Sequence, residues 1–249
     1  MPDNEEDGGT DGGSHDKSGS YTSLPPQKRD LASEPNDQRE EDIDEGDPEE
    51  DPTLSEEERL ARQRAGHEAR RKRAKTAVKK GLVIVNTGKG KGKTTAAMGL
   101  LLRAWGQGLR VCMLQFIKAR TANWGEEKAA RKIGIEMIPL GDGFTWLSKN
   151  IENDKALARQ GWELCRQKIL SGNYDLVVLD EMTYVLKYGW LSWEEIQDTF
   201  DQRPVGMHLV VTGRYAIPEL IEYADLVSEI VEVKHPYQAG IKAQKGIEF

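Results

Sequence analysis

A glycine-rich stretch in the middle of the chain carries the residues best suited to bind phosphate. Residues 82–95 read Leu-Val-Ile-Val-Asn-Thr-Gly-Lys-Gly-Lys-Gly-Lys-Thr-Thr. Glycines let backbone amides turn inward around phosphate oxygens, and the N-terminus of a following helix adds positive potential. An apolar strand, this loop and a helix form the context of a P-loop, in which Lys93 would reach the phosphates and Thr94 would hold Mg²⁺.

The spacing of this loop differs from that of the common P-loop. The usual pattern, GxxxxGK[ST], requires glycine at position 87, where this chain has Thr87. The glycines are instead Gly88 and Gly92, so the loop is one residue shorter. We therefore expect it to hold the phosphates differently from ordinary nucleotide hydrolases.

A second acidic motif follows an apolar run at Leu176-Val-Val-Leu-Asp-Glu181. A buried strand that ends in carboxylates normally lies beside a P-loop and supplies the acid on the metal side. Asp180 and Glu181 are therefore candidates for that role. The alternative is an acidic pair at the N-terminus of a helix, where the helix dipole favours negative charge.

The elements that must position these residues alternate between apolar runs and helical patterns. Runs without polar alternation are typical of strands buried on both faces of a parallel sheet. This succession predicts an α/β fold with a mostly parallel sheet. The predicted strands are Leu82–Asn86, Arg110–Phe116, Ile135–Leu140, Leu176–Asp180, His208–Thr212 and Val227–Val233. The predicted helices lie near 94–107, 125–133, 153–170, 192–202 and 216–223.

The net charge of −7 conceals three unlike segments. Residues 1–58 hold 21 acidic and 4 basic residues and six of the ten prolines, which predicts a disordered acidic tail. Residues 59–80 hold 10 basic residues and one acid, Glu68, and form a basic arm. Residues 81–249 are close to neutral and are long enough for one α/β domain, the P-loop domain.

A helix is predicted over residues 55–80, where Ser55 and Glu58 have the spacing of a capping box. Its apolar residues are mostly alanines, so it has no strong face to bury. Such a basic helix either binds a polyanion or packs as an arm on its own or a partner subunit. Because no aromatic residues interleave with the bases to stack on nucleotides, we do not expect nucleic-acid binding.

Several protein classes are excluded by what the sequence lacks. There is no run of about 18 apolar residues, so no transmembrane helix is predicted. The acidic N-terminus does not resemble a secretory signal. Cys112 and Cys165 cannot form a disulfide framework, which favours a reducing, cytoplasmic location and a role as small core residues.

The ordered motifs GKGKGKTTAAMGLLLRAWGQG, QFIK, GDGFTW, LDEM, VVTGR and HPYQAGIKAQKGIEF together resemble the P-loop type of corrinoid adenosyltransferase. The resemblance covers about residues 81–249, and more loosely the arm. It implies a RecA-like P-loop fold, a homodimer, and transfer of the 5′-deoxyadenosyl group of ATP to cobalt(I) of a corrinoid with release of triphosphate. The product would serve the synthesis or salvage of the adenosylated B12 coenzyme.

The resemblance also implies roles for particular residues. Lys93, Glu181, Arg103 and Arg214 would be catalytic, with Thr94 and Glu181 on Mg²⁺. The residues at the triphosphate would be Gly88, Lys89, Gly90, Lys91, Gly92, Lys93, Thr94 and Thr95. Phe144 and Trp146 would face the corrinoid and exclude its lower axial ligand, so that a reductase or flavodoxin-type donor can reduce cobalt(II). The basic arm would cover the corrinoid site.

Two other readings stay open at this level. A RecA-type motor that hydrolyses ATP on nucleic acid would use the basic arm, and its products would be ADP and phosphate. A nucleoside kinase would need a lid and a substrate base, and neither is evident in the sequence. The missing glycine at position 87 and the Phe-Thr-Trp segment favour the transferase.

Overall fold

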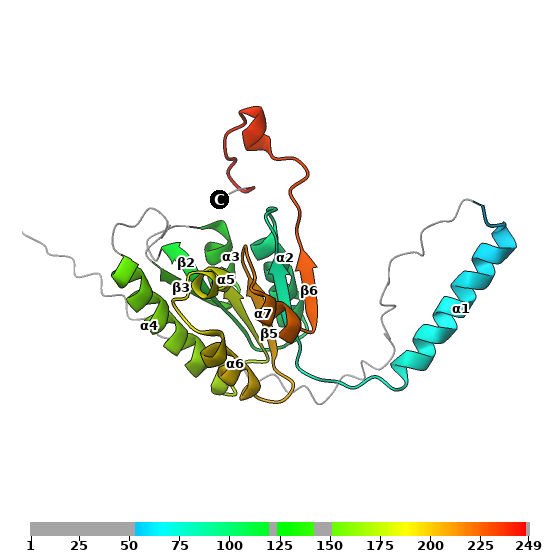
Figure 1. The fold of residues 1–249 in the computed structure, drawn as a ribbon, viewed down its shortest axis with the longest axis horizontal. Coiled ribbons are helices and arrows are strands. Elements are labelled where there is room, and N and C mark those ends of the chain that lie inside the picture. Colours follow the sequence, from blue (N-terminus) through cyan, green and yellow to red (C-terminus); the bar gives the residue numbers. More distant parts are fainter. Residues whose placement is uncertain (1–52, 120–123, 142–150, 248–249) are drawn as a thin grey trace, which may run out of the picture.

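A six-stranded sheet forms the centre of the protein (Figure 1), whose computed structural model describes residues 53–119, 124–141 and 151–247. The strand order is β3-β2-β4-β5-β1-β6, with all pairings parallel. The strands are β1 (Val83–Thr87), β2 (Val111–Ala119), β3 (Glu136–Gly141), β4 (Leu176–Asp180), β5 (His208–Thr212) and β6 (Leu226–Glu229). The predicted α/β class with a mostly parallel sheet is confirmed.

Helices cover both faces of this sheet because successive strand residues point to opposite sides. In β1, Ile84 packs in a cluster with Leu101 of α2, whereas Val83 and Val85 pack in the cluster on the other face. That second face is covered by α4, α5, α6 and α7, and the first by α2 and α3. The helices are α2 (Lys93–Gly106), α3 (Gly125–Lys132), α4 (Ile151–Leu170), α5 (Met182–Lys187), α6 (Trp193–Asp201) and α7 (Pro218–Tyr223).

The observed elements differ from the predicted ones at several places, and the helix predicted over residues 55–80 already ends at Ala74. The last strand ends at Glu229 instead of Val233, because β6 is an edge strand that pairs only with β1 and leaves Val231 and Val233 exposed. Sequence reasoning missed α5, because its six residues are nearly all buried and show no alternation of apolar and polar positions. The two cysteines are buried and unpaired, which confirms the prediction that they are core residues.

A helix before the domain, α1 (Glu56–Ala74), has the predicted capping box. The Ser55 backbone N–H donates to Glu58 Oε2 at 2.8 Å, and the Glu58 backbone N–H donates to Ser55 Oγ at 3.4 Å. None of the helix residues is buried, and Figure 1 shows α1 standing apart from the sheet. Residues 1–52 of the predicted acidic tail lie outside the described residues.

The chain continues past β6 as a largely exposed segment that contains the short 3-10 helix η2 (Pro236–Ala239). Its apolar side chains are open to solvent: Val231, Val233, Tyr237, Ile241 and Ile247 are 51–94% exposed. Within the described ranges, no helix is both long and apolar enough to cross a bilayer.

Candidate functional site

The phosphate loop connects β1 to α2 and is clamped against the chain that follows β6. Gly88 and Gly92 have positive φ angles of 97° and 111°, a conformation that favours glycine. A Cβ at Gly88 would lie 2.4 Å from the Ile230 carbonyl oxygen, so the close approach itself requires glycine. The Gly90 N–H donates to that same oxygen at 2.8 Å, which fixes the loop to the segment after β6.

Thr87 explains the missing first glycine of the loop. It is the last residue of β1, is buried, and its Oγ1 accepts a hydrogen bond from the Ala216 N–H at 3.2 Å. The position therefore belongs to the strand and not to the loop. A side chain is needed there to satisfy a backbone donor between β5 and α7.

Lys93 places its ammonium group inside the loop. It is the first residue of α2, is 6% exposed, and its Nζ donates to the Gly90 carbonyl oxygen at 2.6 Å. Burial lowers its pKa, and the Glu181 carboxylate opposes that effect. A phosphate oxygen is a stronger acceptor for this ammonium than a carbonyl, so the group is placed to move onto a bound phosphate.

Asp180 ties three elements together at the carboxyl edge of the sheet. Its side chain is fully buried, and its Oδ1 accepts hydrogen bonds from Thr94 Oγ1 at 2.9 Å and Thr212 Oγ1 at 2.6 Å. Its Oδ2 accepts from Gln115 Nε2 at 2.9 Å and lies 3.8 Å from Lys118 Nζ. The acidic strand therefore reaches the P-loop as predicted, although β5 lies between β4 and β1 in the sheet.

Glu181 differs from its neighbour because its carboxylate is incompletely partnered. Its backbone has a positive φ of 59°, and its N–H donates to Thr212 Oγ1 at 3.0 Å. Its Oε2 is buried without a hydrogen-bond partner. Burial, and after it the charge of Asp180, raise the pKa of Glu181 to about 7. Burial of an acceptor without a hydrogen-bond partner costs free energy, unless a bound ligand supplies the missing interaction.

These residues fit a hydrated Mg²⁺ that is completed by phosphate. Mg²⁺ usually takes one or two carboxylates, keeps several waters and binds substrate phosphates. Asp180, Glu181 and the Thr94 hydroxyl offer that small oxygen set. Among the described residues no group of three or more His, Cys, Asp or Glu side chains forms a self-sufficient metal site. The donors therefore suit a metal that arrives with the nucleotide.

The structure brings only part of the predicted site together. Arg214 follows β5 and lies close enough for its charge to affect the pKa values of both Lys93 and Glu181. Arg103 is in the last turn of α2, about 15 Å along the helix axis from Lys93 at 1.5 Å per residue. Within one chain, Arg103 is therefore not brought to the phosphate loop, and its role stays a prediction.

The remaining predicted residues divide into exposed loop positions and positions outside the described ranges. Lys89, Lys91 and Thr95 are exposed around the loop, where they are accessible to a nucleotide. Phe144 and Trp146 lie outside the described residues.

Several residues at this edge were missed by sequence reasoning. Gln115 is a polar residue in the middle of the apolar strand β2, and Thr212 is the polar last residue of β5; this signal could have found them. Lys118 lies in the QFIK motif, to which the sequence analysis assigned no role. Its Nζ contacts Glu126 Oε1 at 2.5 Å. Asn86 is buried at the end of β1 with its Nδ2 unpartnered. Two orphaned polar atoms, Asn86 Nδ2 and Glu181 Oε2, thus flank the phosphate loop.

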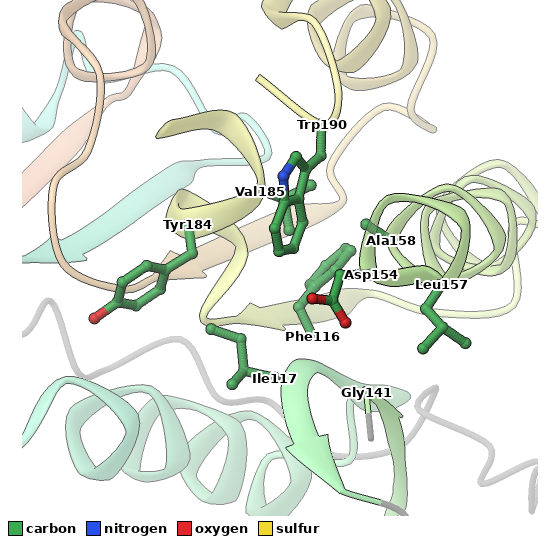
Figure 2. A pocket seen from close by; sticks show the side chains of 9 residues that line it. All are labelled: Phe116, Ile117, Gly141, Asp154, Leu157, Ala158, Tyr184, Val185 and Trp190. Atoms are coloured by element: carbon green, nitrogen blue, oxygen red, sulfur yellow. The ribbon is translucent and has the colours of Figure 1, made fainter. Parts of the chain in front are cut away.

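A second hollow lies beyond β4 on the same edge of the sheet. It is lined from the ends of β2 and β3, from the first turns of α4, and from α5 and Trp190 (Figure 2). Its walls are mostly apolar or aromatic, including Phe116, Tyr184 and Trp190. Asp154 of α4 is the acidic residue among them.

The parallel sheet, the glycine loop and the acidic strand end define a P-loop nucleotide-binding protein of the α/β class. The family model described as ATP:corrinoid adenosyltransferase BtuR/CobO/CobP matches residues 79–249. The chain therefore belongs to the ATP:corrinoid adenosyltransferase family.

Curated relatives agree with this assignment. A corrinoid adenosyltransferase of Escherichia coli (strain K12) is 41% identical over 170 residues, which are 68% of this chain and 86% of that protein. A corrinoid adenosyltransferase of Pseudomonas aeruginosa is 42% identical over 172 residues, with 68% and 84% covered. Among solved structures, flagellar accessory protein FlaH from Methanocaldococcus jannaschii matches with a TM-score of 0.41 at 12% identity, over 61% of this chain and 72% of that chain.

Proposed function

We propose that this protein transfers the 5′-deoxyadenosyl group of ATP to cobalt(I) of a corrinoid and releases triphosphate. Family membership supports the reaction class. The observation that carries the residue assignment is the buried Lys93 ammonium, which is held inside a glycine loop opposite two carboxylates. That arrangement suits a polyphosphate that leaves as one unit.

The reaction needs no nucleophile from the protein. Cobalt(I) supplies the electron pair that forms the Co–C5′ bond, and the C5′–O5′ bond breaks with its pair remaining on the triphosphate. The protein must hold C5′ in line with cobalt and stabilise the growing charge on the leaving group. Both cysteines are buried in the core, which agrees with a reaction that needs no nucleophile from the protein.

Stabilisation of the leaving group falls to the cations at the loop. Lys93 lies at the N-terminus of α2, and the charge of Arg214 acts on Lys93; together these groups would bind the phosphates. Asp180 holds the Thr94 hydroxyl in position, and Glu181 completes the oxygen set. When Mg²⁺ is bound here, it neutralises charge on the triphosphate oxygens.

On the corrinoid side, we assign Phe144 and Trp146 to the lower face of the ring. Bulky apolar groups there would displace the lower axial ligand, and four-coordinate cobalt(II) accepts an electron more easily. A reductase or a flavodoxin-type protein would supply that electron.

We assign a homodimer and a cytoplasmic location to the protein. β6 is an edge strand, and the segment after it exposes Val231, Val233 and Tyr237, which a second copy would cover. The unpaired state of Cys112 and Cys165 supports a reducing compartment.

The decisive experiment incubates the protein with ATP, Mg²⁺ and chemically reduced cobalamin. We expect the absorption spectrum of the Co–C product to appear together with an equal amount of triphosphate. Omitting the corrinoid should leave ATP intact. Formation of ADP and phosphate that is stimulated by DNA or RNA, without a Co–C product, would instead establish the nucleic-acid motor.

A further inference from the structure

The last part of the basic arm, residues 70–80, carries a dense positive charge and is open to solvent. This basic end holds seven Lys and Arg residues and no acid. No residue of α1 is buried, and residues 71–80 are all exposed. Lys80 is paired with Asp225 of the domain, and Figure 1 shows α1 apart from the sheet. The basic end is therefore a charged surface without a cover from the described part of the domain.

Such a concentration of like charges favours an anionic partner. Like charges three or four residues apart destabilise a helix, and within a Debye length of about 8 Å salt screens them only in part. A segment of this kind also attracts nucleic acid through the phosphates, whatever the base sequence. The absence of stacking aromatic residues removes base contacts but does not remove this attraction.

An acidic run with the matching charge precedes the arm in the same chain. Residues 40–51 hold nine acids and no base, against the seven bases of residues 70–80. The match to the family model begins at residue 79, so the acidic run and α1 both belong to the extension in front of the family domain. The two charges therefore occur together in the part of the chain that the family model does not match.

The chain between the two segments is long enough for them to meet. α1 has 19 residues, which gives it a length of about 28 Å at 1.5 Å per residue. Nine residues of extended chain, such as residues 46–54, span about 30 Å. A chain that reverses before α1 and runs back along it therefore brings Gly46 beside Ala74. The acids before Gly46 then face the bases that follow the helix.

The described residues in front of α1 permit this reversal. Thr53 is in a turn and Leu54 in a bend, directly before the capping residue Ser55. The Leu54 carbonyl oxygen accepts a hydrogen bond from Arg59 Nε at 3.2 Å, which holds the bend against the first turn of the helix. The chain therefore enters α1 through a bend and not as a straight continuation of the helix.

We propose that the acidic run, residues 40–51, binds the basic end of the arm in the same chain and shields it from nucleic acid. Because the two segments are linked, the acids act at an effective concentration of about millimolar, which an external polyanion must overcome. The shield explains how a strongly basic arm is compatible with a protein that does not bind nucleic acid. It does not depend on the reaction proposed above.

The first test measures binding of a short labelled DNA duplex of arbitrary sequence to the full chain at low ionic strength. In the variant, the nine acids of residues 40–51 are replaced by Asn or Gln. We expect the Kd for DNA to fall at least about tenfold, and the difference to disappear at high salt. Equal affinities of the wild-type protein and the variant would overturn the proposal.

Two matched controls separate the shield from a change in net charge. Neutralising the six acids of residues 3–16, farther along the same tail, should change the Kd far less. Replacing the four bases of residues 70–73 by Gln in the variant without the acidic run should restore weak binding. An equal gain from residues 3–16, or DNA binding that survives without these bases, would show that the acidic run does not shield the arm.

The second test detects the contact itself by energy transfer between dyes on Gly46→Cys and Ala74→Cys. The native cysteines are buried, so the dyes react at the new positions. Transfer should be high at low salt and should fall at high salt and on neutralisation of the other acids of the run. Transfer that neither change affects would overturn the pairing. Equal transfer in a mixture of singly labelled chains would assign the acidic run to a second copy instead.

Discussion

The carboxyl edge of the sheet has two halves with opposite chemistry. Over β1, β5 and β4 the side chains are polar or charged, and Asp180 alone accepts three hydrogen bonds. Over β2 and β3 the walls are apolar, and Asp154 has an oxygen without a partner. This difference matches the proposed division of the reaction, in which the charged half would hold the leaving triphosphate and the apolar half would face the corrinoid.

The largest expected effect breaks the charged half. Lys93→Ala removes the buried cation of the loop, and we expect kcat/KM to fall about 10²–10³-fold, as for loss of a donor that meets charge developing in a transition state. The measurement is Co–C product formation with pre-reduced cobalamin. Lys132→Ala, on the exposed surface of α3, is the control and should behave as wild type. Near wild-type turnover by a folded Lys93→Ala protein would refute the P-loop assignment.

The second largest effect is expected from substitutions of Phe144 and Trp146, which we assign to the corrinoid. If these residues exclude the lower axial ligand, Phe144→Ala and Trp146→Ala should strongly lower transfer that starts from cobalt(II) and a protein reductant, although by less than Lys93→Ala lowers transfer. Transfer to pre-reduced cobalt(I) should largely survive, since cobalt(I) has little affinity for axial ligands. Both routes are measured in parallel for each variant. Equal losses by the two routes would mean that the residues only pack the protein or position ATP.

A smaller effect separates the metal role of Glu181 from a structural one. Glu181→Gln keeps the shape of the side chain but removes its charge, so the Mg²⁺ concentration for half-maximal activity should rise about tenfold or more, as for other changes around metal ligands. The KM for the corrinoid should change little. Glu194→Gln, an exposed acid on α6, is the control. A fall in corrinoid affinity that excess Mg²⁺ does not reverse would contradict the metal role.

Deletion of the basic arm should impair the use of the corrinoid and leave the use of ATP unchanged. Removal of residues 1–80 should raise the KM for the corrinoid several-fold and leave the KM for ATP unchanged, because the arm is expected to cover the corrinoid. Removal of residues 1–58 is the matched comparison and should leave both constants unchanged. Since no residue of α1 is buried, neither deletion should lower the melting temperature much. An unchanged corrinoid KM without residues 1–80 would assign the arm to another partner.

The smallest effect lies at the opposite edge of the sheet. Asp175 accepts three hydrogen bonds from Arg110, at 2.7–3.0 Å, which lower its pKa below the ordinary value of 3.8. This pair therefore stabilises the fold above that value, and the stabilisation is lost as the pH falls through the lowered pKa. Because both side chains are partly exposed, Asp175→Asn should cost about 1 kcal/mol at neutral pH.

Urea unfolding at neutral pH and near pH 3 measures this contribution. The difference between wild type and Asp175→Asn should shrink at the lower pH, and transfer activity should not change at either. Asp198→Asn, an exposed acid on α6, controls for the removal of a surface charge. A difference in unfolding free energy that is the same at both pH values would show that the ionised pair contributes nothing.

The sequence by itself determined those features that depend on near neighbours. The capping box needs only Ser55 and Glu58 at the right spacing, and the positive φ angles of the loop need glycine at positions 88 and 92. The runs 82–86 and 176–180 predicted buried strands because each is apolar up to its last residue, Asn86 or Asp180. These interactions lie within a few residues of one another, so the order of residues is enough to predict them.

Tertiary structure decided the features that depend on distant partners. The order of strands places β5 between β4 and β1, so that Thr212 can share Asp180 with Thr94. The raised pKa of Glu181 and the orphaned oxygen of Asp154 arise from burial by elements far away in the chain. Desolvation of a group depends on all the residues that cover it, and a local sequence pattern does not show which residues these are. Only the folded chain distinguishes these carboxylates from the many that remain in water.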